Sequence, residues 1–138
     1  MSLFNIFDIS GSGLSAQSVR LNVTASNISN AQSVAGSDDA AYKARNPVFS
    51  TMYEDAFNSQ GANVGVQTLG IVENSAEAPK RYEPGNPLAD EEGYIYLSNV
   101  NPIEEMTNMM SASRGYQNNV EVINTSKDLL LQTLRLGE

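Results

Sequence analysis

The chain has 138 residues, with eight Lys or Arg against sixteen Asp or Glu, so its net charge is −8. It contains no Cys, His or Trp. These absences exclude disulfides, thiolate nucleophiles, Ser-His-Asp sites and the usual zinc and haem centres. The acidic balance argues against nucleic-acid binding. No stretch approaches the ~18 consecutive apolar residues of a membrane span. The N-terminus lacks a basic segment and a small-residue cleavage site, so we expect no cleaved signal peptide.

The N-terminal segment, residues 1–35, predicts a helix from about Leu14 to Ala31. Leu14, Leu21 and Ile28 recur every seven residues, and a short apolar turn or helix precedes them, separated by the break 11–13 (Gly-Ser-Gly). The remaining helical positions are polar and almost uncharged, which is typical of a helix covered on several sides. Its many Asn and Ser residues form helix poorly, so we expect neighbouring chains to satisfy their side chains.

The middle segment, residues 36–100, has β character and contains most of the turn residues. Residues 47–49, 64–72 and 94–97 read as extended strands, which predicts a short hairpin or a three-stranded sheet. Residues 34–39 read as a mobile loop.

The C-terminal segment, residues 101–138, carries the clearest pattern. Asn101 is a predicted N-cap, Pro102 suits the first helical position, and Glu104 completes a capping box. A 3-4 spaced stripe follows to residue 134, which predicts a helix over 102–136 that Gly137 ends. The expected fold is mainly α with a small β lobe, its terminal helices packing as a coiled-coil-like domain. A stripe of this length exceeds what the N-terminal helix covers, so we expect it to contact other molecules.

Chemical motifs are weak. The Gly-Ser-Gly of residues 11–13 lacks the lysine of a phosphate loop. Asp90, Glu91 and Glu92 could supply carboxylates, but they lie in a turn with no second acidic cluster, so a solvated turn is the better interpretation. We therefore expect no catalytic, metal or cofactor site. The predicted site is an assembly interface made of the two helical stripes: Leu14, Leu21, Ala25, Asn27, Ile28, Asn30, Met106, Met109, Tyr116, Val120, Ile123, Leu130 and Leu134.

Several segments resemble one family. Residues 25–31 (Ala-Ser-Asn-Ile-Ser-Asn-Ala) resemble the Ala-Asn-Asn-Leu-Ala-Asn signature of bacterial flagellar axial proteins, which build the rod, hook and hook junctions. Residues 42–49, 82–97 and 104–117 follow in the order of the rod branch. The resemblance implies a structural subunit whose terminal helices form the inner tube of the rod. It implies assembly with itself, other rod proteins and the basal-body ring. It also implies export by the flagellar type III apparatus into the periplasm, without catalysis, cofactor or small-molecule ligand.

Two other functions remain open from the residues alone. The heptad helix also fits a soluble coiled-coil adaptor or binding protein that acts as a discrete dimer. A carboxylate-based hydrolase using Asp90, Glu91 and Glu92 is the third alternative. The filament subunit accounts best for apolar stripes at both ends of the chain.

Overall fold

The computed structural model describes residues 3–53 and 64–136. It confirms the predicted fold class, because a long helix precedes the β region in the sequence and a second long helix follows it. The elements are α1 (Leu3–Asn30), β1 (Val34–Ala35), β2 (Arg45–Tyr53), β3 (Val64–Glu73), β4 (Lys80–Tyr82), β5 (Tyr94–Leu97) and α2 (Pro102–Leu136).

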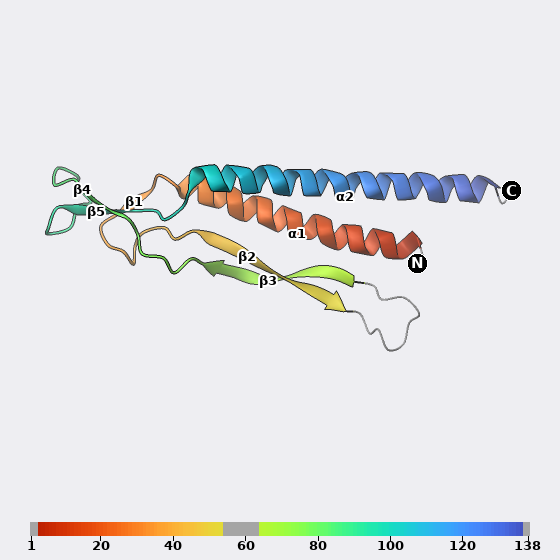
Figure 1. Cartoon of the computed structure of the whole chain (residues 1–138), viewed down its shortest axis with the longest axis horizontal. Coiled ribbons are helices and arrows are strands. Elements are labelled where there is room, and N and C mark those ends of the chain that lie inside the picture. Colours follow the sequence, from red (N-terminus) through yellow and green to blue (C-terminus); the bar gives the residue numbers. More distant parts are fainter. Residues whose placement is uncertain (1–2, 54–63, 137–138) are drawn as a thin grey trace.

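The molecule is elongated, with α1 and α2 lying antiparallel and side by side (Figure 1). The hairpin of β2 and β3 lies along the other side of α1, and it contacts this helix through both strands. The three-stranded sheet, in the order β1-β5-β4, lies at the end where α2 begins. Helix α1 is therefore covered on two sides, as its uncharged polar composition predicts.

Helix α1 is one continuous helix, so the predicted break at residues 11–13 is wrong. Glycine weakens a helix by about 1 kcal/mol, but here it allows a close approach. A Cβ built on Gly13 would lie 2.9 Å from Nδ2 of Asn119 in α2. Ser12 adapts to the helix by donating its hydroxyl to the Ile9 carbonyl at 2.7 Å. The glycine signal therefore marks helix packing here, and not a linker.

Helix α2 begins and runs as predicted. The Asn101 side chain accepts a hydrogen bond from the Ile103 amide at 3.1 Å, which is the expected N-cap. Glu104 remains exposed, while the neighbouring Glu105 is buried against α1. The predicted C-cap, Gly137, lies outside the described residues.

The middle segment contains both predicted alternatives, a hairpin and a three-stranded sheet. The hairpin pairs Arg45 with Glu73, and its register shifts between Val48 and Phe49. Residues 34–39 are not the mobile loop that the sequence predicted, since β1 pairs with β5 in an antiparallel ladder.

Asp38 fixes the turn that follows β1. Its carboxylate accepts hydrogen bonds from the Ala78 amide at 2.7 Å and from the Lys43 ammonium at 3.3 Å. The Ala78 amide, and then the Lys43 ammonium, hold the pKa of Asp38 below its ordinary value because both stabilise the charged form.

The hydrophobic core of the described residues is thin. Ile95 and Ala112 are completely buried, but alanine makes up most of the other buried apolar positions. Many large apolar side chains are exposed on α2 and on the hairpin, among them Leu69 at 64% and Ile103 at 78%. Neither helix, over its described residues, is long and apolar enough to cross a membrane. The apolar surface is therefore distributed along the outside of the molecule.

Gly93 offers a test of the turn before β5. Its φ of +85° suits only glycine well, and an added Cβ would lie 2.9 Å from the Tyr82 ring. We expect Gly93→Ala to lower the free energy of unfolding by about 2 kcal/mol, from strain and overpacking together. Gly85→Ala is the control, because nothing lies within 4 Å of its added Cβ. Urea unfolding of both variants measures the difference, and equal midpoints would contradict this account.

Candidate assembly interface

Small and polar residues form the contact line between α1 and α2. Ala112 is completely buried, and a Cβ on Gly115 would lie 3.1 Å from the Gln17 side chain. From Gly13 to Gln17 along α1, the neighbouring residue in α2 changes from Asn119 back to Gly115. The two helices are therefore antiparallel. The predicted apolar stripes therefore do not fill this line, and small side chains let the helix axes approach closely.

Five of the predicted stripe residues lie beside the contact line, because each directly follows a contact residue in the sequence. Successive residues of an α-helix are about 100° apart around the axis. The helices are both right-handed and antiparallel, so the same rotation from the contact line brings both stripes to one side of the pair. We call this side the stripe face. The pairs, contact residue first, are Gly13–Leu14, Asn27–Ile28, Glu105–Met106, Gly115–Tyr116 and Asn119–Val120.

The hairpin packs on the opposite side of α1. Ser12, which directly precedes a contact residue, accepts a hydrogen bond from the Val66 amide of β3 at 3.1 Å. Ser26, which also precedes a contact residue, lies 3.2 Å from the Tyr42 hydroxyl. The hairpin therefore packs away from the stripe face.

The predicted interface residues differ in exposure. Met106 (53%), Leu134 (63%), Tyr116 (39%) and Val120 (36%) are exposed, as is Ala25. Half-buried positions are Leu14, Leu21, Ile28, Asn30, Met109, Ile123 and Leu130. Only Asn27 among the predicted residues is fully buried, at 1% exposure. Most of the predicted set is thus accessible to a neighbour.

Asn27 has a different role from the one predicted, because its partners belong to its own chain. Its Nδ2 donates to the Arg45 carbonyl at 2.8 Å and to Glu105 Oε2 at 3.1 Å. Its Oδ1 accepts from the Arg45 amide at 2.9 Å and from the Tyr42 hydroxyl at 3.0 Å. One amide thus joins α1, the start of β2 and the start of α2. The expectation that neighbouring chains satisfy this side chain is wrong.

The same correction applies to Asn30, because its Nδ2 donates to the Ser26 carbonyl of its own helix at 2.9 Å.

The sequence pattern did not indicate a role for Glu105. An acidic residue in the first turn of a helix ordinarily indicates only a favourable dipole interaction. Here it is 8% exposed, and Asn27 bonds it across 78 residues of sequence.

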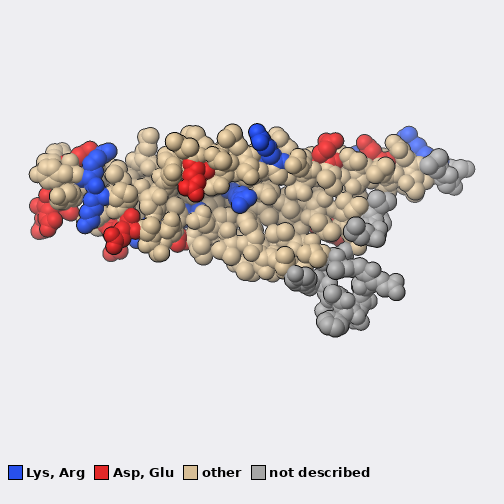
Figure 2. Space-filling model, in the orientation of Figure 1, with Lys and Arg blue, Asp and Glu red and all other residues tan. Residues whose placement is uncertain are grey.

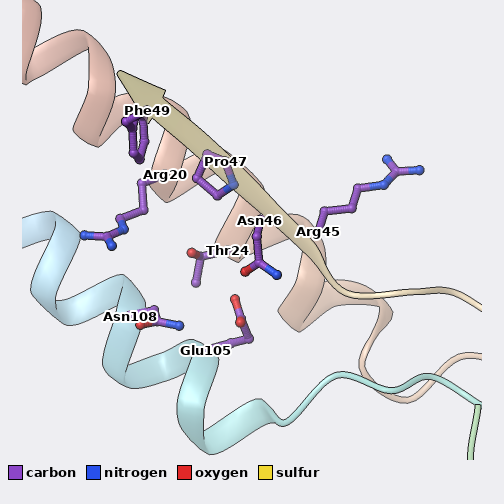
Figure 3. Close-up of a pocket in the computed structure, with 8 residues that line it drawn as sticks. All are labelled: Arg20, Thr24, Arg45, Asn46, Pro47, Phe49, Glu105 and Asn108. Carbon is purple, nitrogen blue, oxygen red and sulfur yellow. The ribbon is translucent and has the colours of Figure 1, made fainter. Parts of the chain in front are cut away.

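A polar cleft of about 120 Å³ opens between α1, α2 and β2 (Figure 3). Thr24, Asn46 and Glu105 point into it, and Arg20 and Asn108 border it at the other end. The space suits a few ordered water molecules, which would satisfy the free positions of these polar groups. The cleft adjoins the polar junction around Asn27, because two partners of Asn27, Arg45 and Glu105, line it.

The acidic turn of residues 90–92 is structural, as the solvated-turn interpretation predicts. Asp90 Oδ1 accepts from the amides of Glu92 at 3.0 Å and Tyr94 at 2.8 Å. Glu91 and Glu92 are exposed. Charged side chains gather over this end of the molecule, whereas the visible body of the helices carries fewer (Figure 2).

Comparison with known proteins agrees with the arrangement of the two helices. Residues 7–36 match the flagella basal body rod protein family, and residues 91–136 match the C-terminal family of the flagellar basal body rod FlgEFG proteins. The chain is 52% identical to the flagellar basal-body rod protein FlgC of Salmonella typhimurium, covering 100% of both chains. It is 50% identical to that of Yersinia enterocolitica and 43% identical to that of Buchnera aphidicola from Acyrthosiphon pisum, again with 100% of both chains covered. The chain belongs to the FlgC family of flagellar basal-body rod proteins.

The two regions that match the rod-protein families lie on the elements that form the stripe face of this FlgC family member. The first region covers most of α1 and continues through β1, and the second covers β5 and all of α2. The hairpin lies between the two matched regions. Family resemblance and apolar patterning therefore identify the same pair of helices.

Gly13 tests the close helix contact in this member of the FlgC family. We expect Gly13→Leu to lower the free energy of unfolding by about 2 kcal/mol, because the new side chain must displace Asn119 from the contact line. Gly11→Leu is the matched control: nothing lies within 4 Å of its added Cβ, and a better helix former raises stability by about 0.5–1 kcal/mol. Denaturant unfolding monitored by circular dichroism measures both. A Gly13→Leu variant as stable as Gly11→Leu would show that the helices do not approach closely there.

Proposed function

We propose that the chain is a structural subunit of the flagellar basal-body rod, and that the stripe face is the surface through which it assembles. The stripe face carries this proposal. Apolar side chains of both helices lie on one side of the pair, and several are more than one-third exposed. Burying apolar surface releases about 25 cal/mol per Å², so association of such faces is favourable.

The proposed neighbours are copies of the same chain, other rod proteins and the basal-body ring. The full-length relatives are named as rod proteins of the basal body, which supports this partner set. In this position the subunit transmits torque and lines a conduit for later export substrates. It works as a passive part and carries out no catalysis.

The proposed location is the periplasmic rod, reached through the flagellar type III apparatus without a cleaved signal. A chain without cysteine forms no disulfides in an oxidising compartment. A thin core, most of it alanine, also suits passage in an unfolded state, because little buried surface must be given up first.

Affinity isolation tests this function. The tagged full-length chain, expressed in a strain lacking its own copy, should restore swimming and co-purify with rod and ring proteins from detergent-extracted basal bodies. A tagged chain that restores swimming but is absent from basal bodies would overturn the proposal. A soluble adaptor that acts as a discrete dimer would not co-purify with these rod and ring proteins.

The alternative, a discrete dimer, makes a different prediction for the isolated protein. A dimer of defined mass would sediment as one species at all concentrations above its dissociation constant. An assembling subunit shows masses that rise with concentration and lack an end point. Sedimentation velocity over a concentration series separates the two.

A further inference from the structure

The polar cleft between α1, α2 and β2 is built from buried side chains. Thr24 is 3% exposed and Glu105 is 8% exposed, and both point into the cleft (Figure 3). Arg20 lies one turn before Thr24 on α1, and Asn108 lies one turn after Glu105 on α2. The cleft is therefore a gap in the contact between the two helices, and β2 forms its third wall.

The Glu105 carboxylate in this cleft has one oxygen without a protein donor. Its Oε2 accepts a hydrogen bond from Asn27 Nδ2 at 3.1 Å, but its Oε1 accepts none from the described part of the chain. The ion pairs of residues 3–53 and 64–136 all join other side chains: Lys43–Asp38, Arg45–Glu73 and Arg81–Glu83. A buried carboxylate without a cation is energetically costly, so Glu105 strongly attracts a positive group that reaches Oε1.

Arg20 does not supply this positive group. Its guanidinium lies at the other end of the cleft and makes no ion pair with Glu105 (Figure 3). The Thr24 hydroxyl also makes no hydrogen bond within the described part of the chain, although this side chain is almost fully buried. A carboxylate oxygen and a hydroxyl therefore face the cleft at the Glu105 end, where both can accept a hydrogen bond.

The cleft suits the end of a lysine side chain. Its volume of about 120 Å³ is well below the roughly 300–1,000 Å³ of a small-molecule pocket. An ammonium group has three N–H donors and no acceptor, which complements Glu105 Oε1, the Thr24 hydroxyl and the Asn46 side chain. A guanidinium group binds a carboxylate best through both oxygens, but Asn27 already bonds Oε2. Lysine therefore fits this cleft better than arginine.

The lysine must belong to another molecule. Of the three lysines in the chain, Lys43 pairs with Asp38, and Lys80 lies over a tyrosine ring at 5.2 Å. Lys127 is 22 residues from Glu105 on the same helix, or about 33 Å at 1.5 Å per residue. No lysine of the chain therefore reaches its own cleft.

We propose that a lysine of a neighbouring rod subunit inserts its ammonium group into the cleft and pairs with Glu105, in place of water. This contact rests on the proposed function and adds to it the chemistry of one partner. The cleft lies toward the hairpin, on the side of the helix pair away from the stripe face. A subunit that uses both surfaces contacts different neighbours on two sides, as an open array requires.

Glu105→Gln tests this contact, because glutamine keeps the size of the side chain and removes its charge. We expect the isolated variant to unfold at the same urea concentration as the natural chain, because the glutamine oxygen still accepts from Asn27. Its recovery in basal bodies should fall by about tenfold or more, since the incoming lysine loses its counter-ion. Glu104→Gln is the matched control: this neighbouring carboxylate is exposed, so recovery should not change. Normal recovery of Glu105→Gln from swimming cells would show that the lysine contact is wrong while the rod function stands.

Carbodiimide cross-linking of basal bodies built from the natural chain decides the matter if Glu105→Gln lowers the stability of the isolated chain. The reagent joins a carboxylate to an amine beside it, so Glu105 should be linked to a lysine of another subunit. Mass spectrometry identifies the linked peptides, and the Asp38–Lys43 pair, whose charged atoms are 3.3 Å apart, is the internal control. A linked Asp38–Lys43 pair without a link from Glu105 to another subunit would overturn the proposal.

Discussion

Asn27→Ala is expected to lower the free energy of unfolding by about 3–5 kcal/mol. The substitution removes four hydrogen bonds and leaves the Arg45 amide, the Arg45 carbonyl and the Glu105 carboxylate without their Asn27 partner. Each buried polar group left unpaired costs about 1–3 kcal/mol. A loss of this size is exceptional for one residue and would unfold a marginally stable domain. Urea unfolding of the isolated chain, followed by circular dichroism, measures it.

Asn30→Ala is the matched control for this prediction. The same side-chain type, one turn further along α1, makes a single hydrogen bond to the Ser26 carbonyl. We expect a loss of about 1 kcal/mol or less, since water replaces this bond at a half-buried site. If the two variants are equally stable, Asn27 does not hold the helices and the hairpin together.

Val120→Asp is expected to abolish swimming while leaving the isolated chain folded. Val120 is 36% exposed on the stripe face, so a carboxylate there stays hydrated in a single molecule. When a neighbour covers this position, the carboxylate becomes buried without a partner, which costs about 3–5 kcal/mol. This cost equals an affinity loss of roughly a hundred- to several-thousand-fold. Ile123→Asp should act in the same way. Swimming in soft agar and recovery of the variant in basal bodies are the measurements.

Asn118→Asp provides the matched control on the same helix. Asn118 is exposed and lies two residues from Val120, on the opposite flank of α2 from the stripe face. The variant gains the same charge but should swim normally and enter basal bodies. Normal swimming by a strain carrying both Val120→Asp and Ile123→Asp would remove the stripe face from assembly.

The C-terminal helix could be predicted from the sequence almost to the residue, because its signals are local. Asn101, Pro102 and the heptad stripe all act within a few turns of their own position. The predicted break at residues 11–13 is wrong for the complementary reason, because the contact that decides the role of Gly13 is distant in the sequence. Gly13 looks like a break from its neighbours in sequence, yet its packing partner, Asn119, is 106 positions further along the chain. A local signal does not reveal whether glycine permits a turn or a close contact.

The interface was predicted only in part, and the reason is physical. Hydrophobic periodicity shows which positions avoid water, but not which surface covers them. In this structure small residues such as Ala112 and Gly115 make the contact between the helices, and the larger apolar residues lie beside it. The partners of Asn27 lie 15, 18 and 78 residues away, so no spacing rule could have identified them.

The alanine-rich interior has a mechanical consequence. A molecule that keeps few of its large apolar groups inside gains little cohesion alone, so a solitary copy is pliant. In the proposed assembly, a neighbour that covers the outward-facing side chains would add cohesion that the single copy lacks, because binding to the folded form stabilises it by mass action. Stiffness is then a property of the assembled shaft, acquired step by step as it lengthens.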